Sequence, residues 1–169
     1  MGLPMKVIDN FLSSYHFKQL QSVLLGNKFS WFFNDFKVIE GDGHYQFTHD
    51  FFNVRHGGVL SPHYLLCDTI QSKLGVRHLD RIKANLTPKT FFHRRSGFHI
   101  DLNPNDPYQH TTTAILYLNT NNGWTRFKKG GKVKSVENRV VIFVSNLEHS
   151  GVTCTDEKQR VLILSLIHI

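Results

Sequence analysis

The stretch "RVLILSLIHI" (Arg160–Ile169) is the part of the sequence that says most about the fold. Apart from Arg160, Ser165 and His168, all of its residues are apolar, so apolar side chains occupy both odd and even positions. Because successive side chains of a strand point to opposite faces, a strand of this kind is covered on both sides. The stretch therefore predicts a central strand with another layer packed on each face of its sheet.

Six further strand-like runs precede this one, and turn-forming residues separate them. The runs are residues 77–86, 97–103, 111–120, 125–129, 132–136 and 139–144. Seven short strands at this spacing are typical of a sandwich or barrel. We therefore expect a β core over residues 77–169.

The N-terminal part carries helical patterns instead. One helix is expected over 13–26, with Ser13 or Ser14 as the N-cap, an apolar face and Gly26 as its stop. A second is expected over 61–75, with Ser61 as cap and Pro62 at the first helical position. Residues 5–11 indicate a short strand, and the aromatic-rich residues 27–60 indicate strand and loop. We expect a single domain over 1–169, in which 1–76 supply helical support and covering strands on one outer face of the core.

Composition restricts the partners and the compartment. Lys and Arg total 20 against 13 Asp and Glu, a formal charge of +7, which favours an acidic partner such as nucleic acid or an anionic small molecule. The charge is scattered, and the densest run, 127–134, is typical of a solvated hairpin tip. Two cysteines without metal-type spacing indicate a reduced, cytoplasmic setting, and no apolar run is long enough to predict membrane insertion.

His99 and Asp101 form the first candidate functional pair. Residues two apart on a strand share a face, and two polar groups aimed into an interior need a common partner: a metal, a proton network or water. His149, just after the apolar run 139–144, is the candidate third group. Two histidines and one carboxylate on a β scaffold are the ligand set of non-haem Fe(II) oxygenases, with zinc as the rival metal. Alternatively, the pair lies on the surface, Asp101 caps the turn at 103–107, and His149 is a loop residue.

Arg160 adds a second requirement. It opens an otherwise apolar strand, and a guanidinium there must meet a carboxylate or phosphate because it cannot lose its charge. The alternative is an arginine at the exposed end of the strand.

Taken in order, these motifs resemble a known family. The segments "FHIDLNPND", "TTTAILYLNTNNGWTRF", "NRVVIFVSNLEHSG" and "EKQRVLILSL" resemble the iron- and 2-oxoglutarate-dependent dioxygenases. Within that family they are similar to the prolyl-4-hydroxylase-like branch, in compact versions such as those of bacteria and phages. The resemblance covers residues 81–169 closely and the N-terminal half in outline.

The resemblance implies a double-stranded β-helix (jelly-roll) fold and a set of site residues. His99, Asp101 and His149 would bind Fe(II), and Arg160 would bind the distal carboxylate of 2-oxoglutarate. Tyr117 either contacts the same carboxylate or is a core tyrosine. The reaction implied is hydroxylation of a substrate C–H bond with O2, releasing succinate and CO2.

The sequence departs from the family pattern at two positions, and three hypotheses for its function stay open. Trp124 stands in a turn where many relatives have glycine, and Leu162 stands where some have a serine that contacts the co-substrate. The branch implies a prolyl or peptide substrate. The basic charge keeps a nucleic acid substrate as a second hypothesis, in which the loop 91–97 lines the mouth of the active site. Two phenylalanines of this loop would stack on bases, and two arginines would contact phosphates. Alternatively, this is a polar loop with two core phenylalanines. A non-catalytic, cupin-like metal-binding barrel is the third hypothesis.

Overall fold

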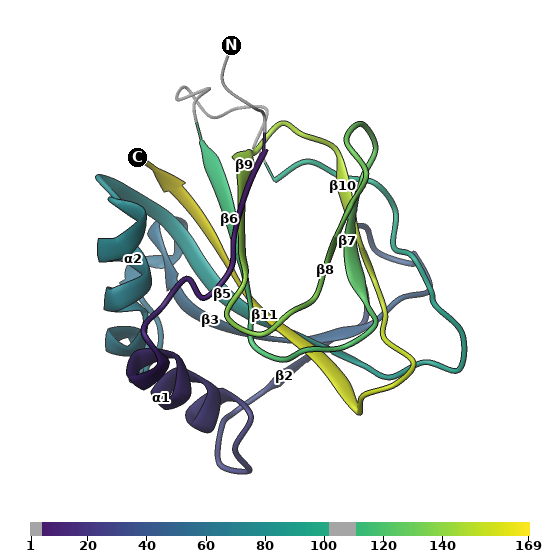
Figure 1. The fold of residues 1–169 in the computed structure, drawn as a ribbon, viewed down its shortest axis with the longest axis horizontal. Coiled ribbons are helices and arrows are strands. Elements are labelled where there is room, and N and C mark those ends of the chain that lie inside the picture. Colours follow the sequence, from purple (N-terminus) through teal and green to yellow (C-terminus); the bar gives the residue numbers. More distant parts are fainter. Residues whose placement is uncertain (1–4, 102–110) are drawn as a thin grey trace.

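The computed structural model describes residues 5–101 and 111–169, which form two antiparallel β-sheets and two α-helices (Figure 1). The large sheet has the strand order β1-β9-β6-β11-β5-β3-β2, with β4 paired to β3. Its strands are β1 (Met5–Ile8), β9 (Val140–Val144), β6 (Thr112–Tyr117), β11 (Gln159–His168), β5 (His78–Pro88), β3 (Gln46–Asn53), β2 (Phe32–Asn34) and β4 (Gly58–Val59). The small sheet has the order β10-β7-β8, with β10 (His149–Val152), β7 (Trp124–Phe127) and β8 (Lys132–Lys134).

Strand β11 lies in the middle of the large sheet, as its apolar sequence predicts. It pairs with β5 on one side and β6 on the other. Val161 and Ile163 belong to the hydrophobic cluster on the helical side of the sheet. Leu162 and Leu164 belong to the cluster between the two sheets. Both faces of β11 are therefore covered, and the prediction of a central strand is confirmed.

The two helices cover the outer face of the large sheet (Figure 1). Helix α1 (Ser14–Leu24) begins at the N-cap Ser13, whose hydroxyl accepts from the His16 amide, and it buries Phe17, Leu20 and Leu24. Helix α2 (Asp68–Leu74) follows a short 3-10 helix, η2 (Tyr64–Cys67); a second one, η1, spans Val54–His56. None of the helices in the two described ranges is both long and apolar enough to cross a membrane.

The second helix differs from the prediction at its start. We expected it to begin at Ser61 and Pro62, but the α-helical part begins only at Asp68. The Ser61 hydroxyl instead accepts from the His63 amide and bonds the ring of the buried His49. Ser61 therefore closes a turn that anchors β3, and one 3-10 helix separates this turn from α2.

Two strand predictions around the small sheet also require correction. Residues 97–101 were expected to form a strand, but the chain there makes only an isolated bridge, at His99. The stretch 145–151 was expected to be a turn, yet His149 opens β10, which pairs with β7. The turn predicted at 103–107 lies outside the described residues. The mainly β class with supporting helices is confirmed, while the assignment of one domain stays a prediction.

Candidate active site

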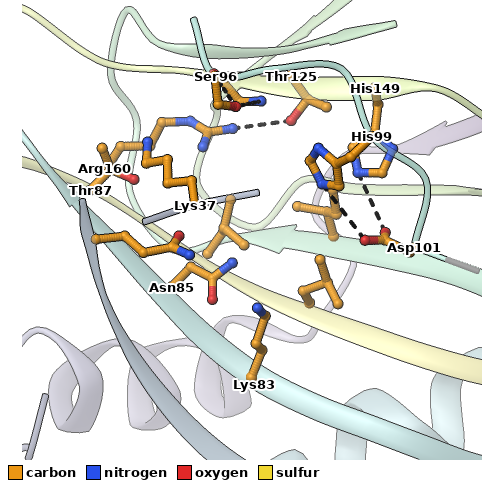
Figure 2. Close-up of a pocket in the computed structure, with 15 residues that line it drawn as sticks. Lys37, Lys83, Asn85, Thr87, Ser96, His99, Asp101, Thr125, His149 and Arg160 are labelled. Atoms are coloured by element: carbon orange, nitrogen blue, oxygen red, sulfur yellow. Dashed lines mark hydrogen bonds and ion pairs between the residues drawn. The ribbon is translucent and has the colours of Figure 1, made fainter. Parts of the chain in front are cut away.

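A polar cavity lies between the two sheets. Side chains from both sheets and from the loop before β3 line it, and the lining residues include Lys37, Lys83, Asn85, Thr87, Ser96, His99, Asp101, Thr125, His149, Arg160 and Leu162. Figure 2 shows His99, Asp101 and His149 together on one side of this cavity and Arg160 on the other. The fold thus brings the predicted metal ligands and Arg160 to one cavity. Tyr117 is not among the residues that line it.

His99, Asp101 and His149 form a compact cluster. One ligand atom from each residue lies within 4.8 Å of those of the other two. His149 Nε2 is 3.4 Å from Asp101 Oδ2, and His99 Nε2 is 3.8 Å from Asp101 Oδ1. The backbones of His99 and His149 exchange two hydrogen bonds of 3.0 Å, which set the two imidazoles side by side. The cluster therefore arises from pairing between the chain before Asp101 and strand β10.

Backbone carbonyls orient both imidazole rings. His149 Nδ1 lies 3.0 Å from the Leu147 carbonyl, and His99 Nδ1 lies 3.3 Å from the Gly97 carbonyl. Since a carbonyl only accepts, each Nδ1 carries the proton and each Nε2 is left as a lone-pair donor facing Asp101. Burial and the neighbouring His149 lower the pKa of His99, which keeps its ring neutral. Neutral, oriented imidazoles are the form that binds a metal.

Asp101 is held by hydroxyls from the large sheet. Thr113 Oγ1 donates to Asp101 Oδ2 over 3.0 Å, and Thr113 also bonds Ser145 Oγ. The Asp101 amide donates to the Ser145 carbonyl over 3.0 Å. The carboxylate is thereby fixed with its oxygens toward both imidazoles. Two imidazole nitrogen donors and one oxygen donor, each supported by further hydrogen bonds, fit a divalent transition metal such as Fe(II).

Arg160 is buried at the other side of the cavity, with only 4% of its surface exposed. Nε donates to Ser135 Oγ over 2.8 Å and an Nη donates to Thr125 Oγ1 over 3.1 Å. Within the described ranges no carboxylate lies within ion-pair distance of it, and its side-chain hydrogen bonds go to two neutral hydroxyls. A buried guanidinium in this situation favours an anionic ligand, and it is not the exposed strand end that was the alternative.

Tyr117 does not line the cavity. Its side chain is fully buried, its hydroxyl donates to Thr125 Oγ1 over 2.7 Å, and its ring lies 5.5 Å below the Arg160 guanidinium. Burial raises the pKa of Tyr117, so its hydroxyl stays protonated. This arrangement favours the core alternative over direct contact with a ligand. Tyr117 supports Thr125 and Arg160 from behind.

Trp124 and Leu162, the two departures from the family pattern, lie in different surroundings. Trp124 points out of the cavity, where its ring contacts His93 and Lys132. The neighbouring Gly123 leaves the space that the Arg160 side chain requires, because a Cβ there would lie 2.9 Å from Arg160 Cδ and 2.8 Å from the Val152 carbonyl oxygen. Leu162 lines the cavity, and the hydroxyls beside Arg160 come from Ser135 and Thr125.

The cavity wall also contains two lysines, Lys37 and Lys83, that were not predicted from the sequence. Burial and the neighbouring Arg160 lower the pKa of Lys37 to about 8, with Asp42 opposing. Burial and Arg81 lower the pKa of Lys83 to about 8, with Asp101 opposing. Neither lysine has a motif spacing that would single it out. Lys83 follows the alternation of β5, however, because its neighbours Ile82 and Ala84 are buried on the helical side.

The loop before His99 exposes the side chains that were proposed to meet a substrate. Phe91 is 94% exposed and Phe92 is 78% exposed, so they are not core phenylalanines. Arg94 and Arg95 are exposed as well. Arg94 lines a small pocket that shares Lys37 and Thr87 with the main cavity. Arg95 lines a separate outer groove beside Trp124.

Known structures share this fold, although no protein-family profile and no curated protein sequence matches the chain. A 2OG-Fe(II) oxygenase family oxidoreductase from Burkholderia pseudomallei superposes with a TM-score of 0.70 at 14% identity, covering 96% of this chain and 84% of that one. The viral collagen prolyl hydroxylase of Paramecium Bursaria Chlorella virus-1, as its 2OG complex, has a TM-score of 0.65 at 15% identity, covering 98% and 96%. A Pseudomonas putida prolyl-4-hydroxylase has a TM-score of 0.59 at 15% identity, covering 98% and 93%.

These similarities establish the fold. The chain has the double-stranded β-helix architecture of 2-oxoglutarate and iron oxygenases, as the sequence predicted. At 10–15% identity they leave the activity of this chain to be argued from its own cavity.

Proposed function

We propose that the chain is an Fe(II)- and 2-oxoglutarate-dependent dioxygenase that hydroxylates a C–H bond and releases succinate and CO2. The observation that carries this proposal is a single cavity with a His-Asp-His cluster on one side and a buried, carboxylate-free arginine on the other. Metal and a 2-keto dicarboxylate are the two ligands that satisfy both sides at once. The fold shared with 2-oxoglutarate oxygenases supports the same conclusion.

Each residue has a defined task in this proposal. His99, Asp101 and His149 bind Fe(II) through Nε2, a carboxylate oxygen and Nε2. Arg160 binds the distal carboxylate of 2-oxoglutarate, held in place by Ser135 and Thr125. When bound, iron with 2-oxoglutarate and O2 supplies the oxidising power for C–H hydroxylation, one oxygen atom entering the product and one entering succinate. The protein contributes orientation, charge and a cavity largely shielded from water.

A non-catalytic metal barrel accounts less well for the cavity. A metal with a purely structural task requires ligands and their supporting hydrogen bonds, which the cluster provides. It does not require a buried arginine whose hydrogen bonds, in the part of the chain that the structure describes, go to neutral hydroxyls. Burying such a charge costs stability unless an anion meets it. Arg160 therefore favours an enzyme with an anionic co-substrate.

The substrate is proposed at the level of chemical class. Two of the similar structures are prolyl hydroxylases, which favours a prolyl or peptide substrate. A nucleic acid is the second candidate, because the loop before His99 exposes Phe91 and Phe92 beside Arg94 and Arg95. Exposed aromatic rings next to cations suit stacked bases and phosphates. Succinate release above the substrate-free rate, measured with proline-rich peptides and with single-stranded oligonucleotides, would separate these classes.

The central experiment is a titration of 2-oxoglutarate into the iron-loaded protein without oxygen, followed by the absorbance of the metal–keto acid chelate. We expect saturable binding, and then succinate release on admission of O2. Asp101→Ala should abolish iron binding, because it removes the only anionic ligand. Arg160→Ala should retain iron and weaken 2-oxoglutarate binding about ten- to a hundredfold. The exposed Lys28→Ala should behave as wild type. A wild-type protein that binds iron but no 2-oxoglutarate would contradict the proposal.

A further inference from the structure

Strand β5 contributes a row of polar side chains to the cavity. This row lies between Arg160 at one end of the cavity and the His-Asp-His cluster at the other. Lys83, Asn85 and Thr87 alternate with buried apolar residues and face the cavity. In the register with β11, Thr87 is opposite Arg160, Asn85 is opposite Leu162, and Lys83 is opposite Leu164. The row thus begins at Arg160 and runs about 13 Å along the strand to Lys83. Figure 2 shows Lys83 and Asn85 pointing into the cavity between Arg160 and the His-Asp-His cluster.

Two of these side chains carry a polar atom that has no partner among the residues that the structure describes. Asn85 Oδ1 is shielded from solvent and has no hydrogen bond. Across residues 5–101 and 111–169 no hydrogen-bond or ion-pair partner lies within reach of Lys83 Nζ, whereas its strand neighbour Arg81 pairs with Asp50. Leaving a buried amide oxygen and an enclosed ammonium unpaired costs stability. Such an arrangement is expected where a ligand completes the bonding.

The charge of the cavity indicates what that ligand is. Among the described residues, three cations, Arg160, Lys37 and Lys83, and one carboxylate, Asp101, line it. A pKa of about 8 leaves Lys83 mostly protonated at neutral pH. A divalent metal on the cluster would add to the positive excess. The ligand that balances such a cavity carries more than one negative charge, with the charges at separate ends.

We propose that Lys83, positioned by Asn85, binds the carboxylate of 2-oxoglutarate that belongs to its 2-keto acid group, at the metal side of the cavity. The inference rests on the proposed function and deepens it. The Lys83 ammonium has three donors, so in the complex it donates to the ligand carboxylate and to the unpaired Asn85 Oδ1 together, a bond that forms only when the ligand draws the ammonium into place. The dicarboxylate is then held by a cation at each end, Arg160 at one and Lys83 at the other. Asn85 is a positioning residue that aims the lysine.

Two keto acids separate the ends experimentally. 2-Oxoglutarate has both carboxylates, whereas pyruvate has the 2-keto acid group and no distal carboxylate. Their dissociation constants are measured on the iron-loaded protein under argon, by calorimetry and by chelate absorbance, with iron affinity measured separately. Lys83→Met should weaken both ligands by a similar factor, about ten- to a hundredfold. Arg160→Met should weaken 2-oxoglutarate and leave pyruvate unchanged.

Further variants keep the test decisive. Lys83→Arg should restore part of the affinity for both ligands, because it keeps the charge, and Asn85→Ala should produce a smaller loss of the same pattern. Lys28→Met, at an exposed lysine, is the matched control. Unchanged keto acid affinities in Lys83→Met overturn the inference, as does a loss confined to iron affinity, which would make Lys83 a partner of Asp101 instead. In both cases wild-type binding of 2-oxoglutarate still upholds the proposed function, whereas its absence would overturn both.

Discussion

Arg160 can enter the cavity because residue 123 has no side chain. A Cβ at Gly123 would lie within 3.0 Å of Arg160 Cδ, Asn121 Oδ1 and the Val152 carbonyl oxygen. The carbonyl belongs to the backbone of β10, so a side chain at residue 123 would shift the local backbone and displace the side chains of Asn121 and Arg160 as well. The glycine therefore fixes the position of a guanidinium that it does not itself contact by hydrogen bonds.

Gly123→Ala should consequently displace Arg160 and weaken 2-oxoglutarate binding by about tenfold, the loss of one good charge-assisted bond. Iron affinity should fall less, because Val152, which the new Cβ would meet, lies at the opposite end of β10 from His149. Pyruvate affinity should also fall less, since pyruvate has no distal carboxylate. Calorimetric titration of the three ligands measures the pattern. Equal losses for pyruvate and 2-oxoglutarate would show that the substitution disturbs the cavity generally.

The two cavity lysines make co-substrate binding dependent on pH. Each has a pKa near 8, so each is a cation below pH 8 and loses its charge above it. The carboxylates of 2-oxoglutarate and the Arg160 guanidinium stay charged throughout. Affinity for 2-oxoglutarate should therefore fall as pH rises from 7 to 9.5, by about tenfold or more. The Lys37→Met/Lys83→Met double variant should bind more weakly at pH 7 and show a flatter profile in the same calorimetric series.

The groups around each lysine determine how far that profile can be attributed to them. Lys37 faces Arg160, Arg94, Asp42 and the Cys154 thiol. Lys83 faces Arg81, Asp50 and Asp101. Carboxyl and guanidinium groups ordinarily titrate outside the range from pH 7 to 9.5. An equally steep profile in the double variant would assign the pH dependence to the remaining thiol, Cys154, or to the metal site.

At the residue scale, the sequence revealed the groups that have a distinctive spacing. His99, Asp101, His149 and Arg160 stood out because polar residues interrupt or adjoin apolar strands. Ser135 and Thr125 did not, although they hold Arg160, because hydroxyl residues are common on strands and carry no spacing signature. Tyr117 was left open between two roles, and only its bond to Thr125 favours one of them.

At the scale of elements, apolar patterns in the sequence identified most strands. One strand, β10, was missed because its sequence contains turn-forming residues. Strand β11 was predicted from its apolar sequence on both faces, and its pairing with β5 and β6 confirms this. Strand β10 was taken for a turn because Ser, Asn and Gly surround His149. Its hydrogen bonds come from β7, which lies more than twenty residues earlier, so tertiary pairing outweighed local propensity.

Helix α1 is joined to the sheets through the turn before β9. Asn138 has a positive φ of 59°, and its side-chain amide both accepts from the Leu12 amide and donates to the Leu12 carbonyl over 2.8 Å. Leu12 is buried, so these bonds satisfy backbone groups that water does not reach. One asparagine thus connects the segment leading into α1 to the β core.

Asn138→Ala should lower the free energy of unfolding by about 2–4 kcal/mol, from two lost buried hydrogen bonds and a left-handed backbone without asparagine or glycine. Asn138→Gly should lose less, because it removes the hydrogen bonds but keeps the backbone conformation favourable. Urea unfolding followed by tryptophan fluorescence measures both. Identical losses in the two variants would mean that the φ angle contributes nothing, and no loss in either would refute the connection.

At the scale of the whole molecule, the cavity joins two sheets that are otherwise separate in their hydrogen bonding. His149 comes from the small sheet, Arg160 and Lys83 from the large one, and His99 and Asp101 from the chain after β5, which bridges to β10 of the small sheet at His99. The helices lie on the far face of the large sheet (Figure 1) and leave the cavity side free. Metal and co-substrate would therefore connect both sheets, and their binding should stabilise the folded molecule as a unit.

Thermal unfolding under argon should show this coupling in two steps. A ligand present at a hundred times its dissociation constant adds about 2.7 kcal/mol to folded-state stability. For a chain of this length each kcal/mol raises the Tm by about 2–4 °C, so iron and then 2-oxoglutarate should each add about 5–10 °C. 2-Oxoglutarate without metal should add much less, because one end of the molecule would lack its partner.

In Asp101→Ala the iron step should disappear and the 2-oxoglutarate step should shrink to the metal-free value. In Arg160→Met the iron step should remain while the 2-oxoglutarate step shrinks. A full 2-oxoglutarate step in Arg160→Met would show that the two sheets are joined through some other anchor.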